Sequence, residues 1–241
     1  MARHPYTIRL IRPGEEQAAF AVERSVWAPF NWLAEGSMGT DYHNDMHLVA
    51  VNAAGRVVAN IDAFPFDWDG NPDTLPAEGW RDAIIAANQG FDHQPRYACA
   101  HGASILPEAR GGGLAADMLV ALRDQVLSLG YVGMVAPLRP TARARMPHLS
   151  IDEYVQVRLP DGHHFDPWLR AHERVGGRII GATERSMYWW GEREQWEEWT
   201  RMRLPDNGSV LIDGSTGWLE LVDGYGVLVE DSVWVLHQPQ R

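Results

Sequence analysis

The chain has 241 residues but only one cysteine, Cys99, and this scarcity excludes an internal disulfide framework. A single thiol fits a reducing compartment, so we expect a cytoplasmic protein. The sequence contains no run of about 20 apolar residues and no apolar signal region at its start, so neither a membrane span nor secretion is expected. No Lys/Arg-rich run is present either. With a formal net charge of -11, nucleic acid is an unfavourable partner.

Repeats and low-complexity segments are also missing, and the length suits one large domain or one domain with an appendage. The chain does have 11 tryptophans, which indicate aromatic surfaces or pocket linings.

The most informative stretch is 97–130. It starts with an apolar run typical of a strand, continues through a Pro/Gly-rich turn, and then shows apolar residues at helical spacing. Gly130 stands where a glycine would end that helix. The sequence therefore predicts a strand, a glycine-rich turn and a helix in succession.

This turn suits an anion, because a helix start leaves backbone N–H groups without partners and glycines let a phosphate come close. A tight turn that binds nothing is the simpler alternative. A Walker loop is excluded, because Leu114 and Ala115 follow Gly113 where Lys and Ser/Thr are needed. A dinucleotide-binding turn would need an acid at the end of the next strand, and the stretch 131–137 ends without one.

The pattern Pro107-x-x-Arg110-Gly111-x-Gly113-x-Ala115 resembles the acyl-CoA pyrophosphate loop of the GNAT superfamily of N-acyltransferases, whose pattern is Arg/Gln-x-x-Gly-x-Gly/Ala. The resemblance implies an α/β (α+β) fold with a mixed, mostly antiparallel central sheet flanked by helices. It also implies acetyl-CoA, or another acyl-CoA, as co-substrate, a small-molecule amine as acceptor, and no metal. The residues it assigns to the acyl-CoA site are Ser104, Ile105, Leu106, Arg110, Gly111, Gly112, Gly113, Leu114 and Ala115.

The resemblance extends over about 5–181, which we expect to form a GNAT-like domain numbered 1–181. A strand at 6–11, a helix after it and a hairpin formed by 47–51 and 57–61 fit that layout. An insertion at about 64–95 precedes the central strand; it carries Trp68 and Trp80 and could cap the acceptor site. The stretch 182–241 reads as a β-rich extension that completes the same domain and could support a homodimer.

His101 is the candidate base, because it lies on the strand before the loop and an amine acceptor is mostly protonated at pH 7. A core histidine with a backbone partner is the common alternative. Cys99 shares its strand face, but nothing else in the sequence argues for a nucleophilic thiol.

His172 is the second catalytic candidate. In the superfamily a late helix carries a tyrosine that protonates the departing thiolate, and alignment on Gly176 places His172 at that position. A partly buried structural histidine is the alternative. By resemblance, Trp27 and Trp32 line the substrate pocket, although packing against the core explains them equally well.

We therefore expect acetyl transfer to a small amine by direct attack in a ternary complex. Two alternatives stay open. One is a GNAT-like module that binds CoA or acyl-CoA without transfer, and the other is an enzyme of the same fold that uses another acyl donor or acceptor.

Overall fold

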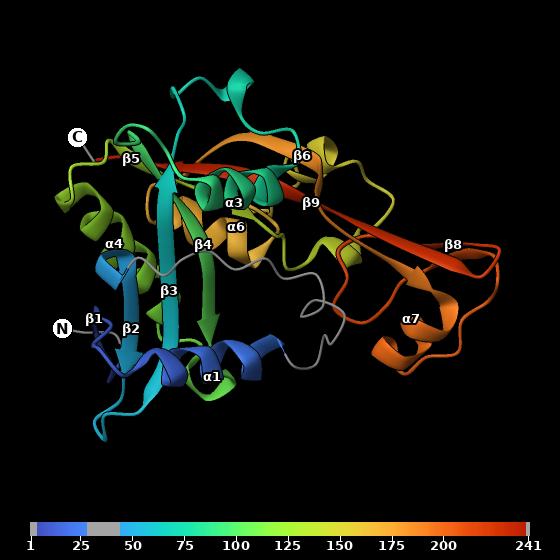
Figure 1. The fold of residues 1–241 in the computed structure, drawn as a ribbon, viewed down its shortest axis with the longest axis horizontal. Coiled ribbons are helices and arrows are strands. Elements are labelled where there is room, and N and C mark those ends of the chain that lie inside the picture. Colours follow the sequence, from blue (N-terminus) through green and yellow to red (C-terminus); the bar gives the residue numbers. More distant parts are fainter. Residues whose placement is uncertain (1–3, 28–43, 240–241) are drawn as a thin grey trace.

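The structure is a computed structural model that describes residues 4–27 and 44–239. These residues form a nine-stranded sheet in the order β1-β2-β3-β4-β5-β9-β8-β7, with β6 paired to β9 as well (Figure 1). Only β4 and β5 pair in parallel, and every other pairing is antiparallel. The strands are β1 Thr7–Leu10, β2 His47–Val51, β3 Val57–Phe66, β4 Tyr97–Ile105, β5 Gly133–Leu138, β6 Arg178–Glu192, β7 Gly208–Val210, β8 Leu219–Val222 and β9 Tyr225–His237. The mixed, mostly antiparallel sheet confirms the predicted fold class.

Helices cover both faces of this sheet. In Figure 1, α1 and α3 cross the near face, while α4 and α6 lie behind it. No helix in the described ranges is long and apolar enough to span a bilayer. The helices are α1 Glu16–Trp27, α3 Gly79–Gln89, α4 Leu114–Ser128, α5 Ile151–Tyr154, α6 Pro167–Arg174 and α7 Arg193–Thr200, with single 3-10 turns η1 Asn44–Met46, η2 Pro72–Thr74, η3 Pro107–Ala109 and η4 Arg143–Arg145.

Local sequence signals explain where several helices begin and end. The Asp166 carboxylate caps α6 by accepting from the backbone N–H groups of Trp168 and Leu169. Ser150 and Glu153 form a capping box at the start of α5, a helix of only four residues. Gly130 follows α4 with a φ of 92°, the left-handed conformation that favours glycine.

The main core lies between α4 and the first strands of the sheet. Along α4 the buried side chains recur every three or four residues, so one face of the helix is apolar. This face packs against buried residues of β2 and β3, such as Leu48, Ala59 and Ile61, which the strand register places on one face of the sheet. Packing of this kind fixes α4, and with it the glycine turn at its start, against the central strands.

Two parts of the chain differ from the sequence prediction. The strand β3 runs past the expected 57–61 and into the insertion expected from about 64; Pro65 pairs with Ala98 inside the ladder. The β-rich stretch expected from 182 begins inside β6, which already starts at Arg178, and β6 and β9 are single long strands. Register shifts within the β6–β9 pairing absorb the extra residues, so the long strand bends without ending.

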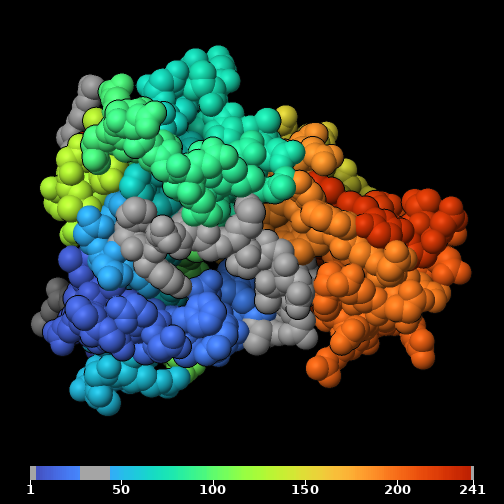
Figure 2. Space-filling view, in the orientation of Figure 1, coloured from blue at the N-terminus to red at the C-terminus, as the bar shows by residue number. Residues whose placement is uncertain are grey.

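The far ends of β6 and β9 project from the body together with β7, β8 and α7 (Figures 1 and 2). This projecting part has a small core of its own, in which Trp196 of α7 packs against Trp189 and Leu228. Its strands belong to the same sheet as the rest of the molecule. The extension 182–241 therefore continues the central sheet.

Candidate active site

The parallel strands β4 and β5 pair over only three residues, from Tyr97 with Gly133 to Cys99 with Val135. Beyond that point β4 continues to Ile105, whereas β5 stays paired only with β9, along its other edge. The backbone edge of β4 that faces β5 is thus left without a strand partner over its second half. An extended ligand can pair with such an edge, because its N–H and C=O groups point outward.

The glycine turn lies at the end of that open edge. Gly111, Gly112 and Gly113 have φ angles of 82°, 57° and 87°, all in the region that residues with a Cβ avoid. Within the described part of the chain, the N–H groups of Gly112 and Gly113 donate to no other backbone group. Since Leu114 begins α4, the positive end of the helix dipole adds to these N–H groups. The turn therefore offers backbone N–H groups at the positive end of a helix, an arrangement suited to an anion. The assignment of Gly111 to Ala115 to the acyl-CoA site stays a prediction.

The Arg110 side chain folds back onto the strand. Its Nε donates to the carbonyl oxygen of Ile105, the last residue of β4, at 3.0 Å. This contact holds the guanidinium against the end of β4. Leu106 is among the residues that the resemblance assigns to the acyl-CoA site. Its backbone N–H, however, already donates to the Val58 carbonyl oxygen at 3.0 Å.

His101 occupies a bulge in β4. Its neighbours Ala100 and Gly102 pair with Ala63 and Asp62 of β3, so His101 is the extra residue. The imidazole Nδ1 lies 3.0 Å from Oδ2 of Asp62, and only 16% and 12% of these two side chains are exposed. Because a carboxylate only accepts, the neutral ring carries its proton on Nδ1 and presents Nε2 as the acceptor. The side chain is therefore arranged as a carboxylate-supported base.

Two further ionisable groups act on this pair. Burial, followed by the charge of Asp62, raises the pKa of Glu23, which α1 places over the sheet. Burial lowers the pKa of His47, the first residue of β2, and the charges of Asp62 and His101 also act on it. Two carboxylates thus share this region with two imidazoles. Such a region favours a positively charged ligand.

Trp27 is the last residue of α1, and its indole N–H donates to the Ser104 hydroxyl at 3.2 Å. This bond ties the end of α1 to the open half of β4. The role of Trp27 in lining a substrate pocket stays a prediction. Ser104 itself is buried. Trp32, the other predicted pocket residue, lies outside the described residues.

His172 has a different environment. It is 1% exposed, and its Nδ1 lies 2.8 Å from Nε2 of His237 on β9. Burial lowers the pKa of His172 well below its ordinary value, and the edge of Trp168 packs against the ring. A neutral, enclosed imidazole is a poor proton donor at neutral pH. The assignment of His172 as the acid stays a prediction, and this environment favours the structural alternative.

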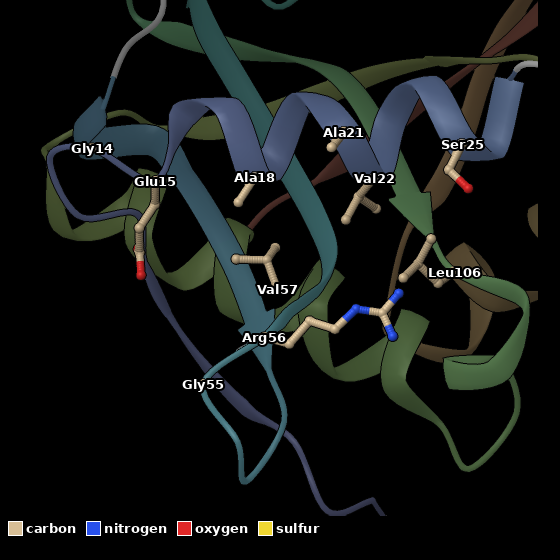
Figure 3. Close-up of a pocket in the computed structure, with 10 residues that line it drawn as sticks. All are labelled: Gly14, Glu15, Ala18, Ala21, Val22, Ser25, Gly55, Arg56, Val57 and Leu106. Carbon is tan, nitrogen blue, oxygen red and sulfur yellow. The ribbon is translucent and has the colours of Figure 1, made fainter.

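One pocket, of about 390 Å³, lies between α1, the β2–β3 turn and the end of β4 (Figure 3). The Arg56 side chain reaches along it toward Leu106 and forms an ion pair of 3.2 Å with Glu108. Neither His101 nor Asp62 lines this pocket, so we assign it no part in the chemistry. Among the described residues, no group of three or more His, Cys, Asp and Glu side chains is placed to hold a metal ion.

The comparison with known proteins agrees with this geometry. The chain is 30% identical over 190 residues to the arginine N-acetyltransferase avaD of Aspergillus versicolor, an alignment that covers 68% of this chain and 64% of that protein. The chain belongs to the GNAT superfamily. It spans less than two thirds of the length of this relative. No family model matches the chain.

Solved structures of other GNAT proteins share the fold. The loading GNATL domain of CurA from Lyngbya majuscula superposes with a TM-score of 0.61 at 14% identity, over 97% of both chains. The GphF GNAT-like decarboxylase, solved with isobutyryl-CoA, gives a TM-score of 0.55 at 21% identity, over 96% of this chain and 98% of its own. Both matches run almost the full length of this chain and of the other.

Sequence reasoning did not name Asp62 or Glu23 as functional residues. Asp62 directly follows the predicted strand 57–61, and an acid at that position was a usable signal. Its link to His101 depends on the register between β3 and β4, however, which the sequence alone does not fix.

Proposed function

We propose that this GNAT protein is an acyl-CoA-dependent N-acyltransferase that moves an acetyl group from acetyl-CoA to an amine of a small, positively charged acceptor. The observation that carries the proposal is the His101–Asp62 pair, held at 3.0 Å in a bulge of β4. It lies where β4 and β5 stop pairing, on the same strand that leads to the glycine turn. A base, an open strand edge and an anion-binding turn are what transfer from an acyl-CoA requires.

In this mechanism the diphosphate of the acyl-CoA binds the N–H groups of the glycine turn, with Arg110 beside it. Each N–H bond to a phosphate oxygen contributes about 1.5–3 kcal/mol. The arm that bears the thioester runs along the open edge of β4. This path brings the thioester toward the bulge at His101. The glycine turn and the His101–Asp62 pair then act on the same acyl-CoA molecule.

The amine must be neutral to attack the thioester carbonyl, and a lysine-like ammonium at pH 7 first gives its extra proton to solvent, at a cost of about 4–5 kcal/mol. As the N–C bond forms, Nε2 of His101 takes the proton that the nitrogen gives up, and Asp62 stabilises the imidazolium. The tetrahedral intermediate then breaks its C–S bond. The thiolate of CoA leaves and receives the proton, so the products are the amide and the CoA thiol.

His101 can return that proton itself. An ordinary imidazolium has a pKa of about 6.5 and a thiol one of about 8.5, so transfer from imidazolium to thiolate is downhill. The reaction then needs no second acid at the position of the superfamily tyrosine. This explains how His172 can be buried in a working enzyme.

A cationic acceptor is proposed for two reasons. The carboxylates of Glu23 and Asp62 lie near His101, while burial lowers the pKa of the neighbouring His47 and so favours its neutral form. The relative with 30% identity carries the name arginine N-acetyltransferase. We therefore propose arginine, or a similar cationic amine, as the first acceptor to examine.

The test is an acceptor panel with radiolabelled acetyl-CoA and product analysis by mass spectrometry. Arginine and lysine represent cationic acceptors, and glutamate is the anionic control. Because the printed sequence contains no lysine, label cannot accumulate on lysine side chains of the protein itself. We expect label in a cationic amine, a large loss of product with His101→Ala, and normal turnover with His163→Ala, which removes an exposed histidine.

Two results would count against the proposal. Acetyl-CoA binding without turnover on any amine would favour the non-catalytic module. Turnover that survives His101→Ala unchanged would remove the proposed base.

A further inference from the structure

The inserted helix α3 places an indole directly on the imidazole of His101. Trp80, in the first turn of α3, donates its indole N–H to the carbonyl oxygen of His101 at 3.1 Å. The indole and imidazole rings are also stacked, with centroids 5.7 Å apart and planes 13° from parallel. One side chain thus contacts both the backbone and the ring of the same residue.

The position of Trp80 is itself fixed by β6. The Trp80 backbone N–H donates to the Ser186 hydroxyl at 3.0 Å. A Cβ added to Gly79, which has a φ of 53°, would meet Ser186 Oγ at 2.6 Å and Thr183 Cγ2 at 2.7 Å. The start of α3 therefore packs closely against β6, and this contact fixes the backbone that carries the indole.

The imidazole is consequently held from several directions. Asp62 binds Nδ1 in the plane of the ring, Trp80 covers a face, and the ring of Phe64 approaches at 64° with a centroid distance of 6.2 Å. A bulge residue has no opposite partner in the ladder, so its ring and carbonyl need such contacts to stay in one orientation.

Among the residues that the structure describes, the ionisable groups that act on His101 include Asp62 from β3, Glu23 from α1 and His47 from β2. The ionisable residues next to Trp80 on α3 are engaged with each other. Arg81 pairs with Glu78 at 2.8 Å, and the Glu78 N–H donates to Asp82 at 3.1 Å. The contribution of α3 at the imidazole is thus an uncharged aromatic face.

We propose that Trp80 is the positioning residue for His101, and that the insertion before β4 supplies this part of the catalytic site. The indole N–H fixes the bulge carbonyl, and the indole face fixes the ring plane so that Nε2 points toward the acceptor amine. The same face stabilises the imidazolium that forms during transfer. The proposal rests on the proposed function, because it assumes that His101 is the base.

The test compares two substitutions of Trp80 with a matched control. Trp80→Phe keeps an aromatic face and loses the N–H, whereas Trp80→Leu loses both. Trp68→Leu is the control, because Trp68 is an indole of the same insertion that bonds to Asn71 and packs on Tyr97. Thermal unfolding establishes that each variant is folded, and if Trp80→Leu does not fold, Trp80→Phe carries the test.

We expect Trp80→Leu to lower kcat about 10- to 100-fold, with an unchanged KM for acetyl-CoA, because a misplaced base slows chemistry without weakening CoA binding. The acid limb of the pH–rate profile should move to lower pH by about half a unit when the aromatic face is lost. Trp80→Phe should keep the pH profile and part of the rate, and Trp68→Leu should match the wild type. Unchanged kcat and pH profile in Trp80→Leu would overturn the proposal.

A readout without substrate separates this proposal from the proposed function. In nitrogen-15 NMR spectra of the imidazole, we expect wild-type His101 to show one tautomer, protonated on Nδ1, and Trp80→Leu to show an average of both. If the wild type acetylates no amine, the proposed function fails, but the tautomer comparison still decides whether Trp80 positions the ring. Identical imidazole spectra in both proteins would refute positioning, whatever the activity.

Discussion

The buried pair of His172 and His237 makes stability depend on acidity. Burial lowers the pKa of both imidazoles, that of His237 to about 4. In the unfolded chain an ordinary histidine has a pKa of about 6.5. The unfolded state therefore binds more protons between these values, and the free energy of unfolding falls as the pH drops below 6.5.

The size of this effect follows from the shift of His237. Between pH 7 and pH 5, a group that moves from about 6.5 to about 4 on folding removes about 2 kcal/mol from the free energy of unfolding. His172 acts in the same direction. The pair lies between α6 and β9, and Trp168 packs against the His172 ring. Water therefore cannot solvate a protonated imidazole there.

Urea unfolding followed by tryptophan fluorescence at pH 5, 6 and 7 measures the dependence. In His237→Gln, the fall in the free energy of unfolding from pH 7 to pH 5 should be about 2 kcal/mol smaller than in the wild type. His163→Gln, which changes an exposed histidine, should keep the wild-type dependence. If wild type and His237→Gln fall in parallel between pH 7 and pH 5, the reasoning about the buried pair is wrong.

Four other substitutions test separate parts of the account. Gly113 has a φ of 87°, and Gly113→Glu should abolish the stabilisation of the fold by acetyl-CoA. In the wild type this stabilisation should be about 2.7 kcal/mol when acetyl-CoA is present at 100 times its Kd. If the variant is stabilised as much as the wild type, the turn is not part of the binding site. Asp62→Asn should lower kcat roughly tenfold or more at an unchanged Kd for acetyl-CoA, and an unaltered kcat would show that His101 acts without it. Asp166→Ala should reduce the free energy of unfolding, measured by urea titration, by about 3 kcal/mol. It leaves the buried Tyr154 hydroxyl and the first backbone N–H groups of α6 without an acceptor. A loss below about 1 kcal/mol would contradict this. Cys99 is fully buried and burial raises its thiol pKa, so it should react with a thiol reagent only after unfolding, and Cys99→Ala should remain active.

The features that sequence predicts well here are local. The strand, turn and helix of 97–130 follow from an apolar run, three glycines and a helical repeat, all within one stretch of chain. The start of α6 follows in the same way from Asp166 and Pro167. Each signal acts on the backbone within a few residues, so no tertiary information is needed.

The features that sequence misses depend on partners far along the chain. Asp62 and His101 are 39 residues apart, and only the β3–β4 register brings them together. Trp80 reaches His101 because α3 is anchored to Ser186, 106 residues away. Pro65 suggested a loop, yet β3 continues through it, because pairing with β4 outweighs the local preference.

The assignment of His172 shows a different limit. Alignment on Gly176 fixes where His172 lies along the helix. It does not predict which side chain of a neighbouring strand contacts His172. Here β9 presents His237, which encloses the ring. A motif position with a changed residue type therefore says little about chemistry until its neighbours are known.

The central claim is tested most directly by the release of CoA thiol from acetyl-CoA, followed continuously with a thiol-reactive dye while arginine is added. The buried Cys99 should not react with the dye in the folded protein, so it should add no background. We expect release that depends on both arginine and enzyme and that is lost in His101→Ala. No release with arginine or any other cationic amine, from a protein that binds acetyl-CoA, would contradict it.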